Sequence, residues 1–387
     1  MPLKRKPSKK VKEEPDRPWL TTGLKVSIKT MFGLLNHSKL TRTAEDYGKY
    51  KTYLNKLTRL KEKAKDKYYR DKSELYGNNK SKTWQLVNEI TNYKRKKSRA
   101  IKSMVDKKGK ILKDSTSIAN CLNDFFANVG KNMAKEFEKN DGIRLRDPLS
   151  YMSKDIKNSL FLSLPNSHEI SKIIHKLDVN KSSHGLISNR VTKVTHEVIS
   201  QYLEILFQKC IKEGVFPDSF KVAEVIPLFK GGDKADMSCY RPISLLPTIS
   251  KIFERVLATR LIKFFTKYKI FSKDQFGFRA KFSTEYAVID IYDKLIHNLD
   301  NGLNSCAIFL DLAKAFDSVS HKILLRKMHH YGIRGNALEL FKSYLSSRSQ
   351  YVKLNGNKSS LMGIEFGVPQ GSILGPLLFL LFIRPCF

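Results

Sequence analysis

The sequence has little that would anchor the chain in a membrane or cross-link it. Its longest apolar run, residues 373–383, has 11 residues and falls well short of the roughly 20 that a membrane-spanning helix needs. The five cysteines are scattered, include no CxxC pair and show no zinc-ligand spacing. No signal-peptide core follows the charged N-terminus. We therefore expect no membrane partner and a reducing intracellular compartment, either the nucleus or the cytoplasm.

Acidic residues are also scarce. There are 37 Asp and Glu against 71 Lys and Arg, which gives a formal net charge of +34. Residues 1–110 alone hold 32 basic and 11 acidic residues, whereas the remainder is closer to a normal balance. A content of 41% hydrophobic residues excludes global disorder. The composition therefore predicts a folded protein with a polyanionic partner, which is a nucleic acid if membranes are excluded.

The first 150 residues are predicted to be mainly basic and helical. Residues 1–17 contain almost no apolar side chains and are predicted to be a basic disordered tail. Residues 18–150 are predicted to be a basic helical connector. Apolar residues recur every three or four positions in 44–75, and a second basic helix is expected over 82–104. A short helix is expected over 115–129. The outer faces of the two basic helices either contact a nucleic-acid backbone or are simply solvated, and the candidate contacts are Lys94, Arg95, Lys96, Lys97 and Arg99.

Denser structure is expected after residue 150. Apolar periodicity predicts helices over 169–177, 194–213, 248–265, 286–299, 322–331 and 337–345, and strands over 223–229, 306–310, 351–354 and 361–366. The strand over Cys306–Leu310 is expected to be buried and to deliver Asp311 at its end, where a carboxylate could bind a hard cation. The alternative is that Asp311 is a cap or turn residue.

Two further segments contain candidate binding residues. Lys230 ends an apolar strand and Arg241 begins the next one, so the two cations together suit a triphosphate, although each could be an ordinary surface charge. Gln370 lies between Pro369 and Gly371 in a predicted tight turn that a ligand could approach. The alternative is a strand-to-helix turn in which Ser372 caps the helix.

Five motifs occur in a characteristic order: IPLFKGGD, YRPISLL, DQFGFRAKFST, FLDLAKAFDSVSH and GVPQGSILGPLLF. Together they resemble the reverse transcriptase of non-LTR (LINE-type) retrotransposons, of the jockey- and chicken-repeat-like group. The resemblance implies an α+β right-hand polymerase fold, with fingers and a partial palm of antiparallel sheet backed by helices. Residues 151–210 would be a helical extension to the fingers, and residues 211–387 the reverse transcriptase domain.

The resemblance also implies roles for single residues. Asp311 matches the first catalytic aspartate, which binds Mg²⁺ with the Leu312 carbonyl as a further ligand. Phe316 matches the wall that excludes a ribose 2′-hydroxyl. The nucleotide contacts that it implies are Lys230, Arg241, Lys314, Ala315, Phe316, Gln370 and Gly371. The implied partners are an RNA template, a DNA primer or target, and deoxynucleoside triphosphates.

One departure from the family pattern concerns catalysis. The family carries a second catalytic segment, an aromatic-Ala-Asp-Asp hairpin, and no such string occurs in these residues. Two-metal catalysis needs carboxylates from both segments, so we expect a palm truncated before this motif and a chain that is inactive in this form. Ile308, Leu310 and the 377–382 run would then lack their normal cover. The alternatives are a non-catalytic, basic nucleic-acid-binding protein derived from a mobile element, and the product of a decayed reading frame.

Overall fold

The computed structural model describes residues 17–77, 79–91, 101–139, 147–152, 156–185 and 187–384. The predicted tail up to residue 16 and the cations of the 94–99 cluster lie outside the described residues. The chain divides into two compact units, residues 1–99 and residues 100–387. We refer to them as unit 1 and unit 2.

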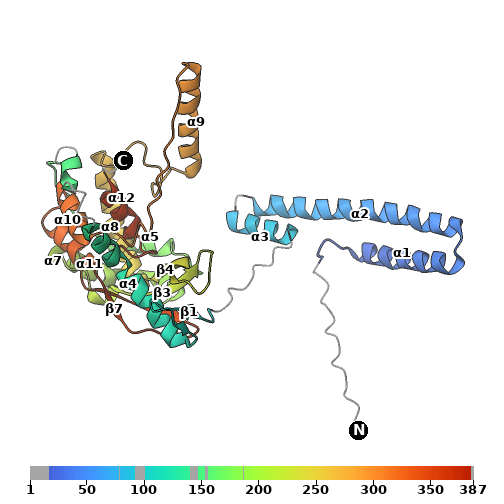
Figure 1. Cartoon of the computed structure of the whole chain (residues 1–387), viewed down its shortest axis with the longest axis horizontal. Coiled ribbons are helices and arrows are strands. Elements are labelled where there is room, and N and C mark those ends of the chain that lie inside the picture. Colours follow the sequence, from blue (N-terminus) through green and yellow to red (C-terminus); the bar gives the residue numbers. More distant parts are fainter. Residues whose placement is uncertain are drawn as a thin grey trace, which may run out of the picture. The chain divides into compact units, whose positions relative to one another are not determined.

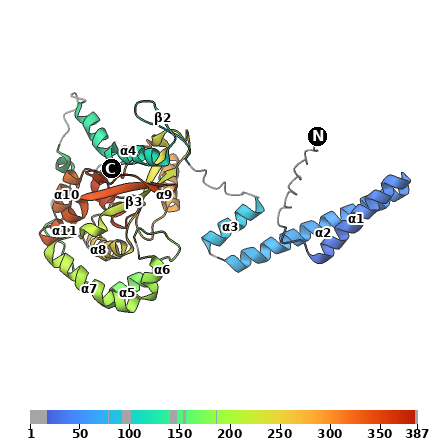
Figure 2. The same cartoon turned by 90° about the horizontal axis from the view of Figure 1, so that it is seen from below.

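Three helices are described in unit 1: α1 (Thr22–Thr41), α2 (Ala44–Tyr76) and α3 (Lys80–Ile90). Helices α1 and α2 form a hairpin and run side by side in both views (Figures 1 and 2). Its core contains Leu24 and Met31 of α1 and Leu57 of α2. The predicted helix over 44–75 is confirmed because its apolar stripe packs on α1.

The helix predicted over 82–104 is wrong in its C-terminal part. Helix α3 ends at Ile90, and the Thr91 hydroxyl donates back to the carbonyl of Val87 at 2.8 Å. Met104 instead belongs to a short strand, β1 (Met104–Val105), which pairs with β2 (Ile111–Leu112). Its side chain is fully buried in unit 2, which accounts for its place outside the basic helix.

The main sheet of unit 2 has five strands: β3 (Val222–Phe229), β4 (Tyr240–Leu245), β5 (Arg348–Leu354), β6 (Asn357–Lys358) and β7 (Met362–Ile364). The order is β4-β3-β5-β6, and β7 also pairs with β5. Strand β3 pairs with β5 in parallel, with Val225 opposite Val352, whereas the other pairs are antiparallel. The sheet is therefore mixed. The fully antiparallel sheet that the family resemblance implies is wrong for the β3–β5 pair, because a long, mainly helical connection lets β5 run in the same direction as β3.

Nine helices are described in unit 2: α4 (Ser115–Lys139), α5 (Ser167–His175), α6 (Asn189–Val194), α7 (His196–Glu213), α8 (Thr248–Lys267), α9 (Thr284–Asp300), α10 (His321–His330), α11 (Asn336–Leu345) and α12 (Leu374–Ile383). The sheet lies between α4 on one side and α5, α7 and α8 on the other (Figure 2). None of the described helices is long and apolar enough to cross a membrane.

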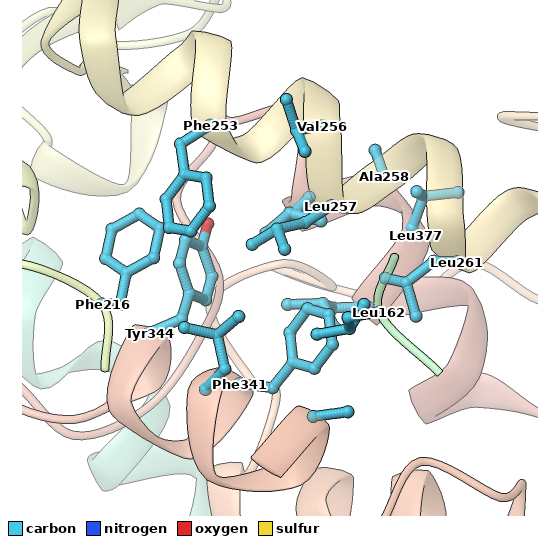
Figure 3. Close-up of a cluster of buried hydrophobic side chains, with 14 of the residues drawn as sticks. Leu162, Phe216, Phe253, Val256, Leu257, Ala258, Leu261, Phe341, Tyr344 and Leu377 are labelled. Atoms are coloured by element: carbon cyan, nitrogen blue, oxygen red, sulfur yellow. The ribbon is translucent and has the colours of Figure 1, made fainter. Parts of the chain in front are cut away.

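Two hydrophobic cores hold these layers together. In the larger core, Phe253 and Leu257 of α8 face Phe341 and Tyr344 of α11 (Figure 3), and Phe253 stacks on Phe207 with ring centroids 4.5 Å apart. The smaller core lies under α4 and contains Ile118, Leu122, Val225 and Val352. The helix predicted over 115–129 is therefore longer than expected and belongs to unit 2. The helix predicted over 194–213 is confirmed as α7, which begins two residues later, after the separate short helix α6.

The strand predicted over Cys306–Leu310 is absent. Residues 303–312 have no regular structure, and Ile308, Phe309 and Leu310 expose 81%, 83% and 72% of their surface. A strand needs a hydrogen-bonded neighbour, and none of the described strands pairs with this segment. The expected loss of cover is thus confirmed for Ile308 and Leu310. It is wrong for residues 377–382, because α12 buries Leu377–Leu381 in the larger core.

Helix α9, which precedes this segment, is also unpacked. It projects away from the rest of unit 2 (Figure 1) and contains no buried residue.

Candidate active site

A cavity of about 530 Å³ gathers most of the candidate residues. It lies where the end of β3, the start of β4, the loop before α10 and the turn before α12 meet helix α4. The structure brings together eight of the residues implied by the motifs: Lys230, Arg241, Asp311, Leu312, Lys314, Ala315, Phe316 and Gln370. These residues span 140 positions of sequence, so only the fold makes them neighbours.

The β3–β4 hairpin positions the two cations. The backbone N–H of Lys230 donates to the carbonyl of Cys239 at 2.9 Å, which closes the hairpin just before Arg241. Gly231 and Gly232 make the turn with φ values of +123° and +96°, a region that side-chain-bearing residues rarely adopt. Neither Lys230 nor Arg241 forms an ion pair with another described residue. Both positive charges therefore remain available at the cavity.

The loop before α10 positions Lys314 and Phe316. Lys314 is in the left-handed region at φ +50°, and its carbonyl accepts from the N–H groups of Asp317 and Ser318 at 2.9 and 3.1 Å. Its ammonium lies 4.4 Å from the centre of the Phe125 ring, and burial lowers the pKa of Lys314.

The Phe316 ring is held on two sides. It stacks on Phe379 of α12 with centroids 4.9 Å apart and meets the edge of Phe278 at 5.8 Å. Its orientation is therefore fixed by packing.

Asp317 also lines the cavity, although the sequence motifs predicted no role for it. Both of its carboxylate oxygens accept from the side-chain amide of Gln370 at 3.0 Å. Burial raises the pKa of Asp317 to about 6, although the Gln370 amide and the nearby Lys314 oppose the shift. The pairing holds the Gln370 side chain in place. It was missed because the two residues are 53 positions apart and no local pattern links them.

The Pro369–Gly371 turn packs directly on β4. The N–H of Ser244 donates to the Gln370 carbonyl at 2.8 Å, and Gly371 has φ +129°. A Cβ at Gly371 would lie 2.6 Å from the Ser244 carbonyl oxygen, so only glycine fits. The alternative reading of Ser372 also holds in part, since its hydroxyl accepts from the Gly375 N–H at 2.9 Å in the first turn of α12.

Glu254 of α8 fixes the start of α12 from beneath. This fully buried carboxylate accepts from the N–H groups of Ile373 and Leu374 at 2.6 and 3.1 Å, and burial raises its pKa. The one feature of the sequence that could have indicated this contact is the position of Glu254 in KIFERVL, on an otherwise apolar helix face.

Helix α4 forms the wall opposite the loop, through Phe125, Phe126 and Val129. It approaches so closely that a Cβ at Gly130 would lie 2.2 Å from the Asp317 carbonyl oxygen. In the sequence analysis this helix belonged to the connector of residues 18–150. The one feature that could have indicated its close approach to the loop is Gly130, which directly follows the helix predicted over 115–129.

The cavity does not contain a complete metal site. Asp311 is exposed at its mouth, and the other carboxylate of the cavity, Asp317, is occupied by the Gln370 amide. No group of three His, Cys, Asp or Glu side chains in the described part of the chain is placed to hold a metal ion. The residues that line the cavity therefore do not fit a two-metal centre.

A comparison with known protein families identifies the class of domain to which the cavity belongs. Residues 232–387, which supply all of the cavity except Lys230 and the α4 wall, match the reverse transcriptase (RNA-dependent DNA polymerase) family. Unit 2 therefore contains a domain of polymerase type, helix-rich and built on a mixed sheet.

Individual proteins with similar sequences indicate which kind of reverse transcriptase the domain resembles. The chain is 34% identical over 234 residues to the RNA-directed DNA polymerase from mobile element jockey of Drosophila melanogaster, a match over 60% of this chain and 25% of the relative. It is 30% identical over 289 residues to a probable RNA-directed DNA polymerase from transposon BS of the same species, which covers 72% of this chain and 31% of the relative. A probable RNA-directed DNA polymerase from transposon X-element of that species is 32% identical over 216 residues, which covers 55% of this chain and 24% of the relative. The chain thus spans about a quarter to a third of the length of these relatives and carries a LINE-type reverse transcriptase domain.

Proposed function

We propose that unit 2 supplies the nucleotide-binding side of a reverse transcriptase active site, which copies RNA into DNA from deoxynucleoside triphosphates. The observation that carries the proposal is the single cavity that unites Lys230, Arg241, Asp311, Phe316 and Gln370 from four separate motifs. The proposed activity is also the one for which the similar retrotransposon polymerases are named.

Lys230 and Arg241 would bind the triphosphate, because both cations lack an ion-pair partner among the described residues and converge on one cavity. The backbone N–H groups of Lys314 and Ala315 would contribute, since neither donates to a backbone carbonyl in the described part of the chain. These groups would neutralise and orient the phosphates, which is the main contribution of a protein to phosphoryl transfer.

Phe316 and Gln370 would shape the nucleotide pocket. The Phe316 ring is fixed by Phe379 and Phe278, as a wall against a ribose 2′-hydroxyl requires. Gln370 is oriented by Asp317, and Gly371 allows the turn to lie flat against β4. The alternative role for Phe316 is packing alone.

Reverse transcriptases generally use divalent metal ions. In this proposal Asp311 and the Leu312 carbonyl would be two ligands for Mg²⁺, and further carboxylates would have to come from elsewhere. We therefore expect a polypeptide of residues 1–387 to show no Mg²⁺-dependent primer extension on an RNA template.

The experiment is a chimera. Residues 1–382 are joined to the part of the jockey polymerase that follows the matched region, and extension of a DNA primer on an RNA template is measured with Mg²⁺. The chimera is expected to extend the primer, and Asp311→Asn to abolish extension. Extension that survives Asp311→Asn would show that the metal assignment is wrong.

The same chimera tests the pocket. Phe316→Ala is expected to retain extension and to admit ribonucleotides, whereas the matched control Phe161→Ala, at an 84% exposed ring outside the cavity, leaves sugar choice unchanged. Lys230→Ala and Arg241→Ala should mainly raise the nucleotide KM. If Phe316→Ala lowers only stability, its role is packing.

A further inference from the structure

One face of α2 carries a row of five cations: Lys56, Arg59, Lys63, Lys67 and Arg70. Successive members are three or four residues apart. At about 100° of helical turn per residue, all five fall within about 80° of arc on the helix surface. We refer to these five residues as the basic row.

The rest of unit 1 packs on the other side of α2. Helix α1 contacts α2 through Leu57 and the half-buried Tyr50 and Ala64. Helix α3 is joined to it by an ion pair in which the Lys72 ammonium lies 2.8 Å from the Glu89 carboxylate. By the same arithmetic, these contacts lie roughly 100–180° around the helix from the centre of the basic row. Unit 1 therefore holds the row facing outward.

The charges of the row are not neutralised locally. All five side chains are exposed, and none forms an ion pair with another residue in the described part of the chain. Other cations of the same helix do: Lys49 pairs with Glu45 at 2.7 Å, and Lys72 pairs with Glu89. The pairing of α2 is thus confined to its ends and its packed side.

We propose that the basic row is a binding site for the phosphate backbone of a nucleic-acid duplex. From Lys56 to Arg70 the helix rises about 21 Å, at about 1.5 Å per residue. One strand of a DNA duplex presents about six phosphates over that length of axis, at about 3.4 Å each. Five cations in a rigid line match that density of charge.

The row also lacks what a single-strand site uses. Single strands are bound by a basic groove together with aromatic rings on which bases stack. The aromatic side chains of α2 all lie outside the arc of the basic row: Tyr47, Tyr50, Tyr53, Tyr68, Tyr69 and Tyr76. Contact with phosphates alone carries no sequence information, so binding is expected to be independent of sequence.

The proposal concerns unit 1 and does not depend on the polymerase assignment of unit 2. Its test reads binding without nucleotides or metal, so its failure and the failure of the proposed function are distinguishable.

The test uses the full chain and a matched pair of double variants. Lys63→Gln with Lys67→Gln removes two charges from the basic row, whereas Lys51→Gln with Lys65→Gln removes two exposed charges from other faces of the same helix. Glutamine retains helix propensity, and circular dichroism checks that each variant is folded. Affinity for a 20-base-pair DNA duplex is measured over a series of salt concentrations.

Each lost phosphate contact reduces the magnitude of the slope of log K against log salt by about 0.9. The slope of the row variant should therefore be smaller in magnitude by about 1.8 than that of the wild type, and the slope of the control should be nearly unchanged. Equal losses in the two variants would overturn the proposal, because only net charge would then matter. It would also be overturned if the row variant lost affinity only for a single-stranded oligonucleotide, or only for phosphatidylserine vesicles.

Discussion

The environment of Asp317 determines how its charge affects stability. Burial places its pKa near 6 in the folded protein, against 3.8 for an ordinary aspartate. Between these two pH values the folded state binds more protons than the unfolded state. The free energy of unfolding contributed by this group is therefore highest below pH 4, decreases as the pH rises to about 6, and is level above that.

Asp317→Asn removes this titration, since the amide stays neutral and its oxygen still accepts from Gln370. We expect the Tm of the variant, measured against wild type, to rise between pH 4 and pH 6.5. Asp236→Asn is the control, because bonds from the side chain and N–H of Ser238 lower the pKa of Asp236, and the stability from its ionised form is lost only as the pH falls below the ordinary value of 3.8. The Tm of this variant relative to wild type should therefore stay level between pH 4 and pH 6.5. A difference for Asp317→Asn that does not vary with pH would show that burial is not the cause.

Helix α4 can pack closely against the loop before α10 only because residue 130 is a glycine, which has no side chain. At Gly130 there is no room for a methyl group beside the Asp317 carbonyl and Phe366. Gly130→Ala is expected to destabilise unit 2 by roughly 1–3 kcal/mol, the usual range for overpacking, despite the better helix propensity of alanine. The measurement is denaturant unfolding followed by circular dichroism.

Gly48 in α2 is the matched control for that prediction. No atom lies within 4 Å of the position that its Cβ would take. Gly48→Ala should therefore stabilise unit 1 by about 0.5–1 kcal/mol through helix propensity alone. If both substitutions are stabilising, α4 does not approach the loop as closely as the structure has it.

Elements with a strong internal pattern could be predicted from the sequence. Helices α2 and α8 and strand β3 lie close to their expected bounds, because their apolar periodicity is local. The segment at 306–310 has an equally clear strand pattern, and yet it has no regular structure and is exposed. A strand depends on its neighbour in space, which the pattern of one segment does not contain.

The candidate site could be predicted only in part, because sequence motifs are local and the contacts that support the site are not. Lys230, Arg241 and Gln370 are found by motif, and the cavity does bring them together. Their supports are not found by motif: the Asp317–Gln370 bonds, the Glu254 cap and the α4 wall all join residues more than 50 positions apart. Only the three-dimensional packing reveals those residues.

At the scale of the whole molecule, each hydrophobic cluster of the described residues belongs to a single unit. One cluster uses residues 20–64 and the other two use residues 101–383. Both tryptophans, Trp19 and Trp84, belong to unit 1. Tryptophan fluorescence should therefore report the unfolding of unit 1 alone.

We expect a polypeptide of residues 100–387 to reproduce the thermal transition that circular dichroism assigns to unit 2 in the full chain. Residues 1–99 should likewise reproduce the fluorescence transition. If the isolated unit 2 has no cooperative transition, the units are not independent, whatever the separation of their cores.

The pairing of α4 with β5 has a consequence for the order in which the protein is made. The Asn123 amide of α4 donates to the carbonyls of Gln350 and Ser360, which follow 227 and 237 residues later. The α1–α2 hairpin is complete at residue 76, and the last core residues of unit 2 emerge about 300 residues after it. At about 5–20 residues per second of synthesis, the basic hairpin is complete roughly 15–60 s before unit 2 can close. The basic hairpin can therefore fold during synthesis, before the cavity of unit 2 has formed.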